Sequence, residues 1–145
     1  MAWTTPKTNW TATSDAMGNY TGDYFSYTDF NRIRNNLVAL TEVAETLFHF
    51  HFTNTLPSTK SITGYPYASD INKFETRLDE INAQSLRLNI GTKKTYTDNG
   101  AFIDADELNR IESAMLTLYQ IFYDSSGGRK KLPFMLGLES SSVRF

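Results

Sequence analysis

The chain has 145 residues, 40% of them hydrophobic, which is the size of one ordinary domain with a buried core. Its formal net charge is −2 and its pattern shows no basic face, which argues against nucleic-acid binding because phosphate recognition needs concentrated lysine and arginine. Cysteine is absent, which excludes disulfides, thiolate chemistry and cysteine-bound zinc.

The first element in chain order is an aromatic segment, residues 1–25, in which Trp3 and Trp10 stand among threonine, asparagine, serine and glycine with no helical period. Either it covers a helical body and buries both indoles, or it is an arm that grips another subunit, because large amphipathic rings suit both tasks. It lacks the apolar core of a signal peptide, so we expect synthesis and folding in a cytoplasm. No apolar run is long enough for a membrane span, so no membrane partner is expected.

Three later segments open with one pattern, in which an acid, an apolar residue, asparagine, a basic residue and an apolar residue follow one another. Apolar residues then recur at alternating steps of three and four, which places them on one face of a helix. The pattern therefore predicts three related helices within residues 26–124. The three openings are Asp29-Phe30-Asn31-Arg32-Ile33, Asp70-Ile71-Asn72-Lys73-Phe74 and Glu107-Leu108-Asn109-Arg110-Ile111.

Polar residues next to these openings predict where the helices start. Ser26 or Thr28 can cap the first helix, Ser69 the second, and Asp104 the third, with Glu107 placed as in a capping box.

The helix ends are predicted less sharply. The first helix is expected to fray over residues 49–53 and the second to end within residues 86–91. The third is expected to end before Ser125-Ser126-Gly127-Gly128, because paired glycines disfavour a helix.

The repeated asparagines, Asn31, Asn72 and Asn109, have two interpretations. Any three amphipathic helices with similar caps look somewhat alike, which would make the likeness incidental. Alternatively the unit is duplicated, the asparagines pin the connecting segments to the bundle, and each neighbouring basic residue pairs with an acid. Either interpretation concerns architecture and implies no chemistry.

Between the second and third helices, residues 93–102 predict a short β-hairpin, because Thr95-Tyr96-Thr97 favours a strand and Asp98-Asn99-Gly100 favours a turn. After the third helix, residues 125–145 carry a basic cluster and then an apolar stretch broken by proline and glycine. Such a segment must be covered, either by its own bundle or by a neighbouring subunit. The fold class is therefore mainly α: a three-helix bundle-like body with a short β-hairpin between the second and third helices and extended arms at residues 1–25 and 125–145.

No residue pattern indicates catalysis, a cofactor or a bound metal. His49 and His51 lie two residues apart without a convincing third ligand, so an aromatic corner at a helix end explains them better than a metal site. The acids between Asp98 and Glu107 do not match a calcium loop, because Gly100 is not at its sixth position. We therefore expect no enzyme activity.

Two strings near the beginning of the chain resemble those of small structural proteins from tailed phages of Gram-positive bacteria. They are Trp3-Thr4-Thr5-Pro6-Lys7-Thr8-Asn9-Trp10 and Asp23-Tyr24-Phe25-Ser26-Tyr27-Thr28-Asp29-Phe30-Asn31-Arg32-Ile33-Arg34-Asn35-Asn36. The resemblance implies a virion component of the tail, baseplate or fibre-attachment region. It implies no catalytic residue.

Together these features predict a non-enzymatic phage virion protein that binds other virion proteins and copies of itself through its terminal arms. The alternative is a host-surface or carbohydrate-binding module, in which Tyr20, Tyr24, Tyr65 and Tyr67 would be the first candidates for stacking on sugar rings. The residues predicted to bind partners in the virion are Trp3, Trp10, Phe134, Leu136 and Phe145.

Overall fold

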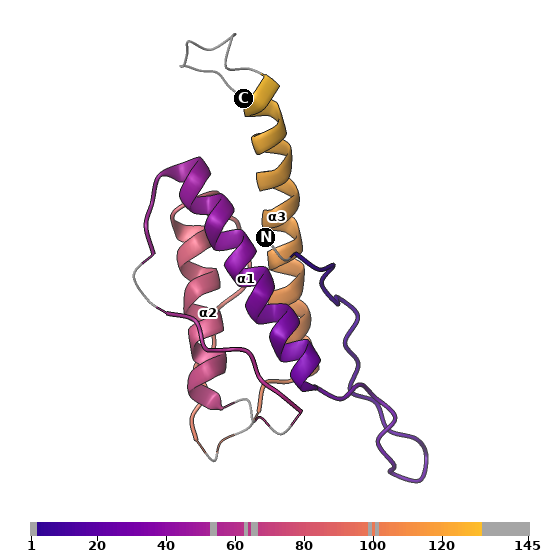
Figure 1. Cartoon of the computed structure of the whole chain (residues 1–145). Helices are drawn as coiled ribbons and strands as arrows, with labels where there is room; N and C mark the ends of the chain where they lie inside the picture. The colour runs from indigo at the N-terminus through magenta and orange to yellow at the C-terminus, as the bar shows by residue number, and fades with distance from the viewer. Residues whose placement is uncertain are drawn as a thin grey trace.

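A computed structural model describes residues 3–52, 55–62, 64, 67–98, 100 and 102–131, with residues 125–131 described by their backbone alone. It contains three α-helices, which are α1 (Tyr27–Phe48), α2 (Ala68–Ala83) and α3 (Ala105–Lys131). Each helix contacts the other two, and the C-terminal part of α3 projects beyond them (Figure 1). The predicted mainly helical, three-helix body is therefore confirmed.

The apolar stripes of the three helices meet in one core. Phe30 of α1 and Phe74 of α2 are fully enclosed, with ring centroids 4.9 Å apart, and Phe122 of α3 is equally buried. Burying a side chain of this size stabilises a fold by roughly 1.5–3 kcal/mol. Most of the apolar residues that recur at steps of three and four lie in this core, including Ile33, Leu37, Leu40, Ile71, Leu78, Ile81, Leu108, Ile111, Met115 and Leu118.

The predicted caps of the first and third helices are confirmed. Ser26 precedes α1, and its N–H donates to the Asp29 carboxylate at 2.9 Å. At the start of α3, the N–H of Glu107 donates to Asp104 at 2.9 Å.

The predicted cap of the second helix is wrong. Ser69 lies inside α2, which begins one residue before it. The start is held instead by Asp70, whose carboxylate accepts the N–H of Tyr67 at 3.1 Å. An acid in the first turn also interacts favourably with the helix dipole.

Two helix ends differ from the predicted ones. The second helix ends at Ala83, before residues 86–91, because the Asn82 side chain bonds both the N–H (2.9 Å) and the C=O (2.7 Å) of Leu88 and folds the chain back. The third helix continues through Gly127 and Gly128. Glycine in a helix costs about 1 kcal/mol relative to alanine but nothing in its geometry forbids the conformation.

The predicted β-hairpin at residues 93–102 is wrong, since the described residues of this stretch form no strand. The Asn72 side chain accepts the N–H of Tyr96 and donates to its C=O, both at 2.7 Å. The central residue of the expected strand has therefore no backbone group left for a partner strand.

Paired backbone lies instead in a loop that we call the excursion, residues 11–23. Ser14 and Tyr20 form an isolated antiparallel bridge. The N–H of Asp23 donates to the C=O of Thr11 at the base of the loop. The excursion projects from the end of the bundle at which α1 begins (Figure 1). Its residues 11–21 are all exposed, so it adds little to the core.

Candidate functional site

The three asparagine side chains of the repeated pattern each hold a distant backbone segment through two hydrogen bonds, an arrangement that we call a clamp. In every clamp the side-chain carbonyl accepts a backbone N–H and the side-chain amide donates to the C=O of the same residue. Asn31 holds Lys60 at 2.7 and 2.8 Å, and Asn109 holds Trp10 at 2.7 and 3.0 Å. The third clamp is the one between Asn72 and Tyr96. The prediction that the repeated asparagines pin the segments connecting the helices is therefore confirmed for Asn31 and Asn72, whereas Asn109 holds the segment that precedes α1.

The clamps follow a cyclic order around the bundle. The asparagine of α1 holds the segment that leads into α2, the asparagine of α2 holds the segment that leads into α3, and the asparagine of α3 holds the segment that leads into α1. The repeat therefore includes a clamped segment as well as a helix. The three units are thereby linked in a ring.

The position three residues after each asparagine also contacts the clamped segment. Glu112 accepts the N–H of Lys7 at 3.0 Å, and the backbone of Lys94 hydrogen-bonds to Glu75. In α1 this position is Arg34. Because arginine is a donor, it bonds the C=O of Pro57, at 3.0 Å, in place of an N–H.

The basic residue beside each asparagine was expected to pair with an acid, and two of the three do. Arg32 forms two hydrogen bonds to Glu112, at 2.9 and 2.7 Å, and Arg110 bonds Glu75 at 2.6 Å. Each of these pairs links two helices. Lys73, at the third position, is exposed.

The electrostatics of these pairs favour the ionised state of the arginines. Burial lowers the pKa of Arg32, but its hydrogen bonds to Glu112 and Asp29 outweigh burial and raise that pKa above its ordinary value. The same balance raises the pKa of Arg110. Burial raises the pKa of Glu75, and the hydrogen bonds from Arg110 oppose that rise. Both carboxylates are therefore held by arginine inside the bundle rather than exposed to a reactant.

Residues 3–10, which we call the strap, lie on the face formed by α1 and α3. Trp3 stacks on Tyr119 of α3, with ring centroids 3.8 Å apart and planes 6° from parallel. Next to it, Asn36 of α1 clamps both backbone groups of Thr4, at 2.8 and 2.7 Å.

The other end of the strap is anchored by Trp10. Its indole is only 5% exposed, and its N–H donates to Glu112 at 2.6 Å. Both predicted indoles are therefore held by their own chain, as the covering alternative expects, and their binding to a partner stays a prediction. Phe134, Leu136 and Phe145 lie outside the described residues.

Sequence reasoning missed Glu75, Glu112 and Asn36 as determinants of this site. A signal for the first two was present, because glutamate follows asparagine by three residues in both the second and third repeats. Asn36 carries no comparable signal. Its equivalent in α3 is Ala114, which lines an open groove of about 450 Å³ beside residues 88–91.

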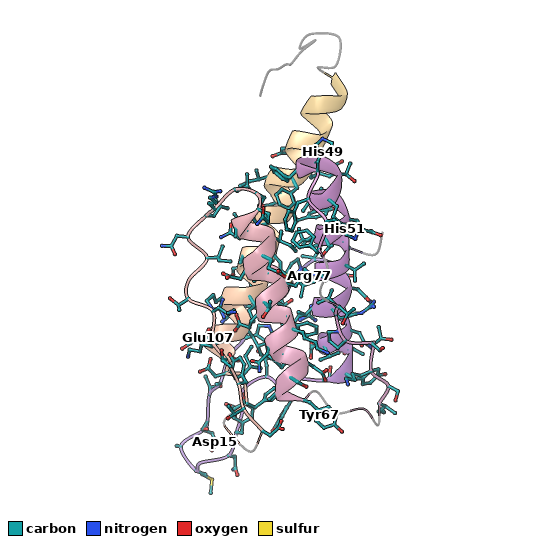
Figure 2. All side chains as sticks on the ribbon, turned by 90° about the vertical axis from the view of Figure 1, so that its left-hand side faces the viewer. Asp15, His49, His51, Tyr67, Arg77 and Glu107 are labelled. Carbon is teal, nitrogen blue, oxygen red and sulfur yellow. The ribbon has the colours of Figure 1, made fainter. Side chains whose placement is uncertain are left out.

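The remaining candidate residues do not converge. Tyr20 of the excursion packs edge to face on Tyr24, which follows the excursion, with ring centroids 5.0 Å apart. Tyr67 lies elsewhere, at the start of α2 (Figure 2). Tyr65 lies outside the described residues.

The two histidines lie near the end of α1, far from the tip of the excursion (Figure 2). His49 is the left-handed residue that ends α1, and exposed His51 lies 3.2 Å from Glu45. Within the described residues, no three histidine or acidic side chains are placed to hold a metal ion. None of the described helices is both long and apolar enough to cross a membrane.

We expect removal of any one clamp to destabilise the fold measurably. Asn31→Ala, Asn72→Ala and Asn109→Ala should each lower the free energy of unfolding by about 1–3 kcal/mol, since both backbone groups of a part-buried residue lose their partner. Urea denaturation followed by circular dichroism measures this. Asn89→Ala is the matched control, because Asn89 is exposed and its side chain accepts only a local hydrogen bond, from the N–H of Gly91. Equal losses in the control and in the clamp variants would contradict the assigned role.

Comparisons of the chain with protein families, with curated proteins and with solved structures find no match.

Proposed function

We propose that the chain is a non-enzymatic structural protein of a phage virion, from the tail, baseplate or fibre-attachment region, and that it assembles through its terminal arms. The observation that carries the proposal is the way the helical body holds the strap. Asn36, Asn109 and Glu112 bind its main chain, and two stacked or buried indoles fix its register. A body that holds an extended arm in this manner is suited to linking subunits.

The buried polar side chains of the bundle support an architectural role. Glu75, Glu112 and Asn36 are almost completely enclosed, and each bonds a backbone segment or an arginine of another helix. Polar groups committed in this way fix geometry, because leaving any of them unpaired is costly. The resemblance of residues 3–10 and 23–36 to small phage structural proteins points in the same direction.

The second arm begins where α3 leaves the bundle. Phe48 and Tyr123 are exposed there, and Tyr123 has 67% of its surface accessible. Residues 125–131 continue the helix beyond α1 and α2 (Figure 1). The apolar residues that follow in the sequence, Phe134, Leu136 and Phe145, are the proposed contacts with other virion proteins or further copies.

The test combines composition of the particle with oligomeric state. Mass spectrometry of purified particles should detect the chain as a stoichiometric component. Light scattering should show an oligomer for the full chain and a lower mass for a full-length variant with serine at Phe134, Leu136 and Phe145. A variant with serine at the exposed positions Thr46 and Thr117 is the control. Absence of the chain from particles would overturn the virion role.

A further inference from the structure

The strap is attached to the bundle differently from the other two clamped segments. Lys60 reaches α2 through residues 61–67, and Tyr96 reaches α3 through residues 97–104. Trp10 reaches α1 only through residues 11–26, which include the whole excursion. The connection of the strap is therefore much the longest of the three, although its clamp is equivalent.

Most contacts of this connection are exposed hydrogen bonds between residues of the excursion itself. Residues 11–21 are exposed, and the two sides of the excursion are joined by bonds from Thr11 to Asp23 and from Thr13 to Thr21. Exposed hydrogen bonds of this kind exchange with water at little net cost. Stretched at roughly 3.3 Å per residue, the connection would span about 50 Å, more than the roughly 33 Å length of a helix such as α1.

The contacts of the strap with the helices do not depend on this connection, unlike the ion pair of Lys7 with Asp23 (3.4 Å) and the packing of Trp10 on Phe25. The contacts with the helices run from Trp3 to Tyr119, from Thr4 to Asn36, from Lys7 to Glu112 and from Trp10 to Asn109. Every receiving residue belongs to α1 or α3. A second copy of the chain presents the same face, so its bundle offers the strap the same set of partners.

We propose that the strap of one copy docks on the α1–α3 face of a second copy, and that the chain assembles by exchanging identical straps. The inference rests on the proposed assembly through terminal arms and names the partner of one of them. The exchanged and closed forms share the contacts of the strap with α1 and α3, and they differ in the excursion and in the ion pair between Lys7 and Asp23. Exchange of identical elements is a low-cost route to oligomers, and the balance between the two forms depends on protein concentration.

The absence of cysteine in the chain allows a direct test with two full-length variants, Thr5→Cys on the strap and Gln120→Cys on α3. Both positions are exposed, and they lie close to the stacked Trp3 and Tyr119. One variant is labelled with ¹⁵N, and the two are mixed at high concentration, diluted and treated with a short bis-maleimide. Mass spectrometry then identifies which chains are joined. A double variant, Thr5→Cys with Gln120→Cys, shows whether the reagent spans the two sites.

The expected result is a mixed dimer joined from Thr5→Cys to Gln120→Cys, at least ten times more abundant than either like-with-like dimer. If the double variant is joined only within single chains and the mixture gives no mixed dimer, the strap does not exchange. A double variant that is not joined at all would overturn the docking of the strap in either form. An oligomer by light scattering without mixed dimer would leave the assembly role standing and refute only the exchange.

Discussion

Replacing Glu112 with alanine is expected to lower the free energy of unfolding by about 3–5 kcal/mol, because it leaves a largely buried arginine without its main partner. Glu112 is fully buried, and Arg32, which forms two hydrogen bonds to it, has a side chain only 16% exposed. The same carboxylate accepts the indole N–H of Trp10 and the backbone N–H of Lys7. The measurement is urea denaturation at neutral pH, followed by circular dichroism and by tryptophan fluorescence.

Two variants make this prediction sharp. Glu42→Ala removes an exposed acid of α1 and should change the free energy of unfolding by no more than about 0.5 kcal/mol. Glu112→Gln keeps the shape but removes the charge, so it should be destabilised less than Glu112→Ala. A loss below about 1 kcal/mol for Glu112→Ala would contradict the description of this residue as the point where strap, α1 and α3 are joined.

Replacing Phe30 with alanine is expected to cost about 3–5 kcal/mol, the range for removing a large aromatic side chain from a packed core. Phe30 is completely buried, its ring packs against Phe74, and the ammonium of Lys60 lies 5.4 Å from the ring centroid. The cavity would therefore open between α1, α2 and the segment clamped by Asn31. Thermal and urea unfolding of the variant measure the effect.

The matched control for Phe30 is Tyr24→Ala, since Tyr24 is an aromatic residue of the same region that is 74% exposed. Its replacement should lie within about 0.5 kcal/mol of the unchanged protein. Phe30→Leu should be intermediate, because it retains part of the buried volume. If Phe30→Ala and Tyr24→Ala were equally mild, the core would not be organised around the pair of Phe30 and Phe74.

The local features of this fold were accessible from the sequence, because each is set by neighbouring residues. Apolar steps of three and four located all three helices, and the caps at Ser26 and Asp104 are interactions over three positions. The recurring asparagine also indicated its task. What the sequence did not reveal is the residue that each asparagine holds, since Asn109 and Trp10 are separated by most of the chain.

The wrong predictions, of the β-hairpin and of the end of the third helix, also have physical causes. A β-propensity around Tyr96 was overridden by a side chain of α2 that occupies both of its backbone groups. The helix-breaking tendency of Gly127-Gly128 is a modest free-energy cost, and α3 continues through it. Arg34 stands where the other two repeats have glutamate. The repeat tolerates this change because Arg34 donates to a backbone C=O, whereas the glutamates accept a backbone N–H.

Because α3 holds the strap, the clamps constrain the order in which parts of the molecule can fold during synthesis. Lys7 and Trp10 bond to residues of α3 that follow them by about one hundred positions, with separations of 105, 102 and 99 residues in the three bonds. Ribosomal synthesis therefore delivers the strap long before its binding face exists. Contacts between such distant positions slow folding, because a large loop must close before they form. Until α3 emerges, both indoles lack the residues of α3 that they contact, so α3 completes the first unit of the repeat.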